Sequence, residues 1–528
     1  MKFPMTTDDG FSNSATTRRA FGRSIVAGAA SALLARPSWS GPLERTLAIT
    51  GATGRRLSAD YVGFSYETAQ LADPTFFAPD NRELIGLFHA LSPRGVLRIG
   101  GNSSEFCWWR TRPDQPQPPD PSSAGNENNW MPHTMTAIEP AAIDNLAAFL
   151  AATGWSAIYG LNLGTGTPER AAEESAYVAR ALGPKLLYFQ IGNEPEYYRD
   201  AHNGLRAPDW DFDKYLVQWS AMARAVLARV PEARFGGPDV GSNAQWVVRF
   251  AREVPQLFPG RIVAATGHYY AEGPPDDPRV TVARLLAPDP RVARDLTAVA
   301  AATNAAGIPY RMTEGNSCYR GGKPGMSNAF CSALWAADYM LQLAAYGCVG
   351  VNLHGGGTKQ IRAALGGHLP GEALDPRAAE IAREGSFYTP IAGSRGLGFK
   401  ARPILYGMKL AGLLAGGRMR TASLDGAAPG VSVYAADIGE GATRVVVINK
   451  DEESEVVIRI ASSGGAKLWR LEAPGLTATA GVTFAGSAIE SRGWEPGSEE
   501  HVESRDGAVR VAVKAASAVG VLFDRRLS

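Results

Sequence analysis

The sequence is poor in cysteine, with four in 528 residues: Cys107, Cys318, Cys331 and Cys348. None forms a CxxC pair, and no histidine lies at metal-ligand spacing from them, which argues against a structural zinc site. In an oxidising compartment some of these thiols would pair, whereas buried free thiols are an equally good alternative. The sequence alone fixes no disulfide connectivity.

The chain also lacks a charge bias, because its formal net charge is +1 and charged residues make up 20%. Without a global field, nucleic acid is not expected as a partner, and any charged substrate must be held by a few local groups. There is no internal repeat, low-complexity tract, Ser-His-Asp arrangement or phosphate-binding glycine loop.

The N-terminal segment carries the paired arginines Arg18 and Arg19 ahead of a short apolar run at 25–35. That run is too short to span a bilayer, and the arrangement resembles a twin-arginine export signal. Residues 1–40 are therefore predicted to be a signal, cleaved between Ala35 and Ser40. The signal implies export of the folded protein from a bacterial cytoplasm to the periplasm or medium, with no membrane association after cleavage.

A chain of 528 residues is too long for one compact domain, so at least two are expected. From about residue 60 to 415, short apolar runs alternate with segments of helical spacing. The eight expected strands cover 61–66, 95–99, 156–163, 186–191, 233–240, 261–267, 309–313 and 349–353. This alternation predicts an α/β fold, a (β/α)8 TIM barrel. A doubly wound sheet would need a glycine fingerprint after its first strand, and residues 63–67 are not one.

Beyond about residue 416 the pattern changes to closely spaced short strands separated by turn residues. The expected strands are 431–436, 443–449, 455–460, 467–471, 508–513 and 518–523. This spacing is typical of a small antiparallel β-sandwich over 416–528. The segment 41–59 is predicted to form one or two strands around a turn at 51–54 and to join the sandwich. The segment 113–132, rich in Pro, Asn and Ser, is predicted to be a long loop.

Catalytic residues of such a barrel lie at the carboxyl ends of its strands. Those ends carry Glu67, Asn102, Asn193, Glu194, Tyr269, Glu314, Asn352 and His354. Two glutamates and several neutral hydrogen-bonding groups would therefore meet on one face. Paired carboxylates without metal ligands are the apparatus of glycoside hydrolysis, so neither a metal nor a cofactor is expected.

The two glutamates are assigned different roles. Glu194 ends an apolar strand in a Gly-Asn-Glu-Pro turn, where a buried carboxyl can act as an acid near neutral pH. It would protonate the leaving oxygen, and Asn193 would hold a sugar hydroxyl. Glu314 would be the ionised nucleophile, hydrogen-bonded to a tyrosine from the sixth strand. Strands four and seven lie on opposite sides of the barrel mouth, so the carboxylates could approach to the ~5 Å of a retaining pair.

Several stretches between the first and seventh strands carry a family resemblance. They are residues 63–67, 97–103, 190–195, 268–270 and 313–322. In these stretches the chain is similar to glycoside hydrolase family 79, the β-glucuronidases and heparanases, within a clan of retaining barrel hydrolases. The Asn-Glu-Pro turn is shared by many related families, whereas Tyr319-x-Gly321-Gly322 is far more specific. The N-terminal strand and C-terminal sandwich also fit that family.

The resemblance implies a substrate that carries a carboxylate. In the family, the turn after the nucleophile holds a uronate through a tyrosine hydroxyl and glycine N–H groups, which implies this role for Tyr319 and Gly321. A later tyrosine would assist, with Tyr388 as the candidate and Tyr406 as the alternative. The remaining implied roles are ring-hydroxyl binding by Glu67, Asn102 and Asn193, and support of Glu314 by Tyr269.

Three features depart from the family pattern or leave their role open. Arg320 lies inside the carboxylate turn, where its guanidinium would point either toward the substrate or toward solvent. The polar segment 358–385 is interpreted as an inserted loop near strand eight that either walls off the pocket or lines a subsite. Trp108 and Trp109 would form either a sugar platform or part of the core.

Together these features predict a secreted, retaining exo-β-glucuronidase that releases glucuronic acid, with or without a 4-O-methyl group, from an oligo- or polysaccharide. The first alternative is an endo-acting, heparanase-like hydrolase, which a strongly basic cleft would favour. The second is a barrel hydrolase for a neutral sugar, which has no use for a carboxylate turn. The third is a non-catalytic carbohydrate-binding barrel, against which the presence of both glutamates argues. The oligomeric state is left open.

Overall fold

The computed structural model describes residues 43–120, 131, 134–199, 204–439, 441–497 and 499–527. The export segment expected at 1–40 and part of the loop expected at 113–132 lie outside the described residues. Among the helices of the described residues, none has the length and apolarity that a membrane span requires.

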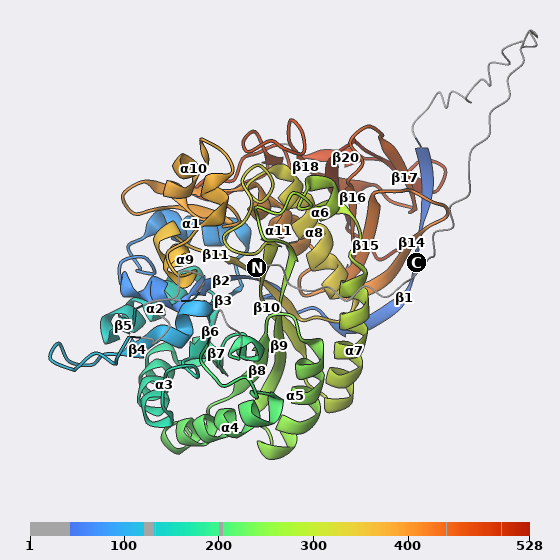
Figure 1. Ribbon diagram of the computed structural model, residues 1–528. Coiled ribbons are helices and arrows are strands. Elements are labelled where there is room, and N and C mark those ends of the chain that lie inside the picture. The colour runs from blue at the N-terminus through green and yellow to red at the C-terminus, as the bar shows by residue number, and fades with distance from the viewer. Residues whose placement is uncertain are drawn as a thin grey trace, which may run out of the picture. The chain divides into compact units, whose positions relative to one another are not determined.

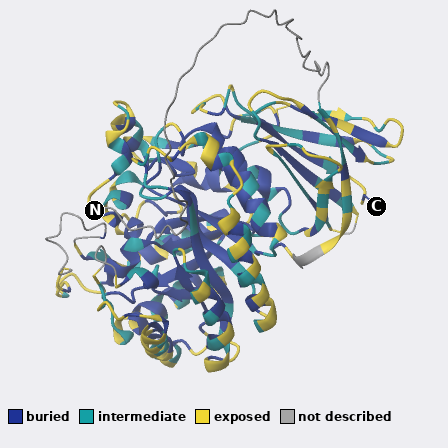
Figure 2. Ribbon diagram, turned by 45° about the vertical axis from the view of Figure 1, so that its right-hand side comes forward, coloured by how far each residue is buried: buried dark blue, intermediate teal, exposed yellow. Residues whose placement is uncertain are grey.

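Eight parallel strands close into a barrel in sequence order, as the sequence predicts (Figure 1). They are β2 (Val62–Glu67), β3 (Val96–Gly100), β6 (Ser156–Leu161), β7 (Leu186–Ile191), β8 (Phe235–Val240), β9 (Ile262–Glu272), β10 (Tyr310–Cys318) and β11 (Gly350–Gly355). Their side chains are almost all buried (Figure 2), as expected for parallel strands covered by helices on the outside and packed side chains within.

A helix follows each barrel strand and covers the outside of the barrel. These helices are α1 (Arg82–Leu91), α2 (Pro140–Thr153), α3 (Pro168–Leu182), α4 (Phe212–Arg229), α5 (Ala244–Leu257), α7 (Pro290–Ala306), α8 (Phe330–Ala345) and α11 (Pro403–Gly412). Several begin at a capping side chain: Thr167 accepts a hydrogen bond from Arg170 N, and Asp211 from Lys214 N. Such caps satisfy amides that have no partner inside the helix.

Two barrel strands run further than the sequence predicts. The strand expected at 261–267 extends to Glu272, and the one expected at 309–313 extends to Cys318. The extensions pair with each other, because Gly315 lies opposite Tyr269 and Cys318 opposite Glu272. They lengthen both strands at the carboxyl end of the barrel.

The predicted C-terminal β-domain is present as one ten-stranded sheet, which is antiparallel except for one parallel pair that involves the N-terminal strand. Its strands are β1 (Leu43–Arg56), β14 (Arg418–Leu424), β15 (Val431–Ile438), β16 (Ala442–Asn449), β17 (Val456–Ala461), β18 (Ala466–Glu472), β19 (Thr483–Phe484), β20 (Glu500–Val502), β21 (Ala508–Val513) and β22 (Ser517–Phe523). The sheet curls on itself, since Val445, Val511 and Val519 from distant strands share one core.

The N-terminal strand joins this sheet, as predicted, but as one element. β1 runs antiparallel to β14 and parallel to β17, with its register shifting around Thr50 and Ala52, where the sequence indicates a turn (Figure 1). The sheet also bonds to the barrel: Phe330 N donates to Ala478 O (2.9 Å) and Tyr434 OH donates to Asp338 Oδ1 (2.7 Å).

The region after β11 has more structure than the expected loop. Residues 358–385 include α9 (Thr358–Ala364) and α10 (Ala378–Glu384), followed by the hairpin β12 (Ile391–Ser394) and β13 (Gly398–Ala401). The remaining elements are α6 (Val282–Leu286) and the pair β4 (Cys107–Trp109) and β5 (Thr136–Ile138). All four cysteines are buried free thiols. Of the two alternatives, disulfide pairing or free thiols, the structure therefore has the second.

Candidate active site

Glu194 occupies a strained turn at the end of β7. Its backbone lies in the left-handed region (φ 46°, ψ 50°), a conformation that costs a non-glycine residue about 1–3 kcal/mol. The turn is held from both sides: Glu194 N donates to Asp239 O (2.8 Å), and Asn193 N donates to Glu105 Oε1 (2.5 Å). A Cβ at Gly241 would lie 2.7 Å from Glu194 Oε1, so this glycine leaves the carboxyl its space.

Glu314 lies on β10, opposite His268 of β9. Tyr270 OH donates to Glu314 Oε1 (2.9 Å), and Arg98 Nη1 donates to Glu314 Oε2 (2.6 Å). Burial alone would raise the pKa of Glu314, but the charges of His354, His268 and Arg98 and the Tyr270 hydrogen bond hold it well below its ordinary value. The carboxylate is therefore ionised at neutral pH.

The prediction that Tyr269 supports Glu314 is wrong, and Tyr270 makes that contact. Tyr269 OH instead donates to Asp289 Oδ2 (2.7 Å), and its ring stacks on Tyr339 of α8. The reason is the alternation of side chains along a strand. Because β9 continues past residue 267, His268 and Tyr270 face the glutamates and Tyr269 faces the surrounding helices.

Arg98, at the centre of β3, links the two halves of the site. Besides Glu314, its guanidinium donates to Asn193 Oδ1 (2.7 Å) and pairs with Asp239 Oδ2 (2.5 Å). Arg98 and Asp239 are each about 1% exposed. Burying one charge without the other would be costly, so the pair fixes both side chains in place. The amide of Asn193 is oriented by this contact.

His268 lies between two carboxylates. Its Nδ1 is 3.0 Å from Glu194 Oε1, and its Nε2 is 3.1 Å from Asp239 Oδ1. Burial alone would lower the pKa of His268, but the carboxylates of Asp239 and Glu314 and the contact with Glu194 raise it to about 10. The imidazolium is thus positively charged at neutral pH.

Glu194, His268 and Glu314 each place one side-chain oxygen or nitrogen within 4.8 Å of the others. The two carboxylates therefore face each other at short range. These three side chains are also the set that could bind a metal ion, but both ring nitrogens of His268 already face carboxylates. A metal would have to displace one of those contacts.

The residues predicted to bind ring hydroxyls border the same site. Glu67 Oε2 accepts hydrogen bonds from the N (2.8 Å) and Oγ (2.6 Å) of Ser103, and its Oε1 lies 3.3 Å from His354 Nε2. Asn102 is half-buried, and its Oδ1 accepts from Asn193 Nδ2 (3.2 Å). Glu67, Asn102 and Asn193 are thus linked to the catalytic end of the barrel.

Asn352 does not belong to the substrate face. Its Nδ2 donates to Phe64 O (3.0 Å) and Val96 O (2.8 Å), and its Oδ1 accepts from Arg311 Nη1 (3.0 Å). All its polar atoms are used inside the barrel wall. His354 lies further along β11, with its Nδ1 3.1 Å from Ser65 Oγ and 3.7 Å from Glu314 Oε2.

The turn after Glu314 packs close to Tyr270. The Tyr319 ring meets the Tyr270 ring edge-on, with centroids 6.5 Å apart. Gly321 has φ 87°, a conformation that favours glycine, and a Cβ there would displace the end of the Leu369 side chain. Arg320, with φ 57°, places its Cζ 5.7 Å from the Tyr319 ring centroid.

Of the two candidate tyrosines for the carboxylate turn, Tyr388 is the one that lies there. Tyr388 N donates to Gly321 O (3.3 Å), and its ring lies 6.2 Å from that of Tyr270. Tyr406 is in α11, where its hydroxyl accepts from Ile489 N (2.8 Å) at the contact with the sheet.

The segment 358–385 packs on this turn. Ile361, Leu369 and Tyr388 share one buried cluster, and Asn102 Nδ2 donates to Ala364 O (3.4 Å).

The two tryptophans do not form a platform. Trp109 packs against Tyr177 of α3, and Trp108 shares a buried apolar cluster with Phe106 and Met135, so the partners of both place them in the core.

Sequence reasoning assigned no role to Arg98, Glu105, Asp239, His268 or Tyr270, which hold the two glutamates. The available signal was a charged residue inside an apolar strand, as for Arg98 in Val96–Gly100. Buried charges in such runs need partners and often mark functional sites. The partner of each could not be read from the sequence, because the contacts join different strands.

The chain is similar to known glycoside hydrolases. Residues 433–519 match the model of the glycosyl hydrolase family 79 C-terminal beta domain. A beta-glucuronidase of Aspergillus niger is 26% identical over 486 residues, 81% of this chain and 82% of that protein. A beta-glucuronidase of Neurospora crassa is 24% identical over 330 residues, 56% of this chain and 57% of that protein.

Among solved structures, the chain resembles a 4-O-alpha-L-rhamnosyl-beta-D-glucuronidase from Fusarium oxysporum, with a TM-score of 0.69 and 18% identity. The likeness covers 91% of this chain and 100% of that one. At this identity it shows the fold, a TIM barrel with an attached β-sheet domain.

Proposed function

We propose that the chain is a β-glucuronidase of glycoside hydrolase family 79 that acts by retaining double displacement. The observation that carries the mechanism is that Glu194 and Glu314 each place one carboxyl oxygen within 4.8 Å of the other, an approach that favours the closer of the two known spacings. Carboxyl groups of retaining glycosidases are about 5–5.5 Å apart, whereas inverting pairs stand about 6.5–9.5 Å apart to admit a water.

In the first step Glu314 attacks the anomeric carbon and Glu194 transfers a proton to the leaving oxygen. The nucleophile is supported by Tyr270 and Arg98, which keep it ionised and oriented. His268 lies against the acid, so Glu194 is oriented by a cation at 3.0 Å. The C–O bond of the leaving group breaks as the Glu314–sugar ester bond forms.

In the second step Glu194, now a carboxylate, takes a proton from water, and the resulting nucleophile displaces Glu314. Between the two steps Glu194 is negatively charged, because its proton left with the departing group, and the adjacent His268 imidazolium stabilises that charge. Arg98 accommodates the charge returned to Glu314. The product keeps the anomeric configuration of the substrate.

The proposed substrate is a β-linked glucuronic acid at a chain end. The named activities of the curated relatives support the sugar, and the turn formed by Tyr319, Arg320 and Gly321 supports a carboxylate site. Exo action is supported by the segment 358–385, because Leu369 packs on Gly321 and Ala364 O accepts from Asn102. This packing places the segment against two of the residues proposed to hold the sugar.

Export through a twin-arginine pathway belongs to the same proposal and rests on Arg18 and Arg19. Replacing both with lysine should leave the protein in the cytoplasm of its bacterial host, as measured by fractionation and immunoblotting. Unchanged appearance in the periplasm or medium would contradict this part of the proposal.

The test of the function is hydrolysis of an aryl β-glucuronide beside the matching aryl β-glucoside. We expect cleavage of the glucuronide alone, and its loss in Glu194→Ala and Glu314→Ala. Tyr319→Phe should lower the rate on the glucuronide by about 10-fold, the effect of losing one hydrogen bond to a charged group. Equal cleavage of both substrates, or activity that survives in Glu314→Ala, would refute the proposal.

A further inference from the structure

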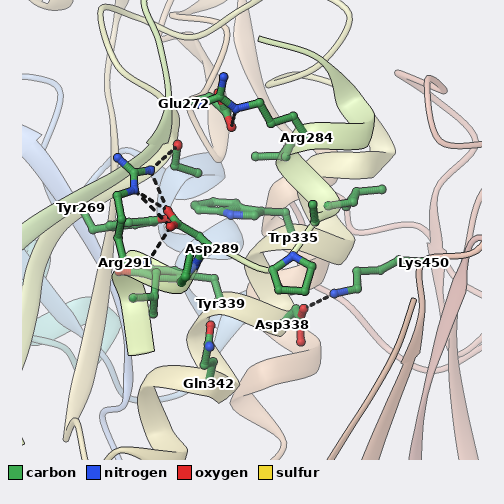
Figure 3. Close-up of a pocket in the computed structure, with 17 residues that line it drawn as sticks. Tyr269, Glu272, Arg284, Asp289, Arg291, Trp335, Asp338, Tyr339, Gln342 and Lys450 are labelled. Atoms are coloured by element: carbon green, nitrogen blue, oxygen red, sulfur yellow. Dashed lines mark hydrogen bonds and ion pairs between the residues drawn. The ribbon is translucent and has the colours of Figure 1, made fainter. Parts of the chain in front are cut away.

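A cavity of about 220 Å³ lies outside the barrel wall, where β9, α6, the start of α7 and α8 meet the β-sheet domain (Figure 3). One face of α8 lines it, with Trp335, Asp338, Tyr339 and Gln342 at i, i+3, i+4 and i+7. Between Phe330 and Ala344, Asp338 and Gln342 are the two partly exposed positions, and the others are buried. This face of α8 therefore opens to the cavity.

Three aromatic rings form a continuous wall of the cavity. Tyr339 is stacked between Tyr269, at 4.7 Å, and Trp335, at 5.3 Å, with interplanar angles of 18° and 6°. Figure 3 shows the three rings close together, with Lys450 of the sheet domain reaching Asp338. The rings hold one another rigidly, so the wall is formed before any ligand arrives.

The charged groups around this wall are paired with one another. Three ion pairs border the cavity: Glu272 with Arg284 (2.9 Å), Asp289 with Arg291 (2.6 Å) and Asp338 with Lys450 (2.5 Å). The lining thus has many hydrogen-bonding groups but no excess charge of either sign. An ionic ligand would have to break one of these pairs, whereas a neutral polyhydroxyl ligand would not.

We propose that this cavity binds a neutral pyranose ring, as a site separate from the glutamate pair. Aromatic rings bordered by hydrogen-bonding groups are a lining that small-molecule sites use, and the paired charges suit a neutral ring with hydroxyl edges. The volume falls below the roughly 300 Å³ at which drug-sized ligand sites begin, which limits the occupant to about one ring. Gln342 supplies the side-chain amide.

The cavity is connected to the catalytic site through β9. His268 and Tyr270 face the glutamates from this strand, whereas Tyr269, between them, belongs to the aromatic wall. Glu272, at the rim, also accepts a hydrogen bond through its carbonyl from Tyr319 N (3.1 Å). A sugar held here would therefore lie on the far side of β9, the strand that positions Tyr270 against Glu314.

The test is isothermal titration of the full chain with methyl β-D-glucopyranoside and with cellotriose, in the presence of saturating D-glucuronate. Saturable binding of the methyl glycoside that glucuronate does not compete away is the expected result. If cellotriose binds more tightly than the methyl glycoside, the natural ligand is one residue of a glycan chain. If the two bind equally, the natural ligand is a single sugar ring. Absence of saturable binding of both probes, or full competition by glucuronate, would overturn the proposal.

Gln342→Leu should weaken that binding by roughly fivefold, because it removes one side-chain hydrogen bond at nearly constant volume. Gln256→Leu makes the same change on the solvent-exposed side of α5 and serves as the matched control. Melting temperatures of both variants establish that they are folded. Equal affinities in the two variants would exclude Gln342, and with it this cavity, as the binding site.

Discussion

Tyr269 and Tyr270 are adjacent residues of the same type with different surroundings. The hydroxyl of Tyr270 is 2.9 Å from Glu314 Oε1, and that of Tyr269 is 2.7 Å from Asp289 Oδ2 on the other side of β9. Burial raises the pKa of both phenols, so each donates its proton and neither ionises at neutral pH. This pair allows the contribution of one hydrogen bond to be measured against an internal control.

We expect Tyr270→Phe to lower kcat by about 10- to 100-fold, because a hydrogen bond to a charged group contributes about 1.5–3 kcal/mol. Tyr269→Phe should leave kcat within about twofold, since its partner Asp289 keeps its contact with Arg291. Steady-state kinetics on an aryl β-glucuronide measure both. A larger loss in Tyr269→Phe than in Tyr270→Phe would contradict the assignment.

At the scale of elements, the turn between β7 and the following 3-10 helix (Pro195–Tyr197) is tied to the end of β8 by a buried carboxyl. Glu196 Oε1 accepts from Ser242 N (2.9 Å), and its second oxygen has no hydrogen-bond partner. Burial first, and then the nearby charge of Glu194, raise the pKa of Glu196 to about 8. The carboxyl is therefore neutral in the folded protein at pH 7.

This pKa predicts how stability depends on pH. In the unfolded chain Glu196 ionises near its ordinary pKa of about 4.5, whereas in the folded chain it keeps its proton to about pH 8. The contribution of Glu196 to the free energy of unfolding is therefore fully present below pH 4.5 and is lost as the pH rises through 8. Glu196→Gln keeps the acceptor for Ser242 but cannot ionise, so its melting temperature should fall less than that of the wild type between pH 5 and 8.

The control for this comparison is Glu173→Gln, at an exposed position of α3. Its melting curve should run parallel to that of the wild type across the same range. If the Glu196→Gln curve also stays parallel to the wild type, the carboxyl of Glu196 is ionised in the folded protein and the interpretation of this turn is wrong.

At the scale of the whole molecule, the sequence was sufficient for the barrel and its two glutamates. The alternation of strands and helices is a local pattern that survives folding, and it led to Glu194, which follows β7, and to Glu314, which lies within the longer β10. The length of β9, in contrast, is not determined by its local sequence. It extends to Glu272 because Gly315 and Cys318 of β10 offer it partners, and that extension decides which tyrosine faces the nucleophile.

The network around Arg98 and the topology of the sheet escaped prediction for the same reason. Arg98 contacts residues 95, 141 and 216 positions away in the chain, and no spacing in the sequence records such distances. Likewise β14, whose Thr421 lies opposite Thr50 of β1, has a half-exposed, weakly patterned sequence that becomes a strand through its partner.

The most direct test of the paired-glutamate mechanism is to trap its covalent intermediate. Incubation with 2-deoxy-2-fluoro-β-D-glucuronyl fluoride, followed by peptide mass spectrometry, should show one fluoroglucuronyl group esterified to Glu314. The label should accumulate further in Glu194→Ala, which lacks the base for the second step. Labelling of another residue, or turnover of an aryl glucuronide with inversion and no label, would contradict the retaining pair.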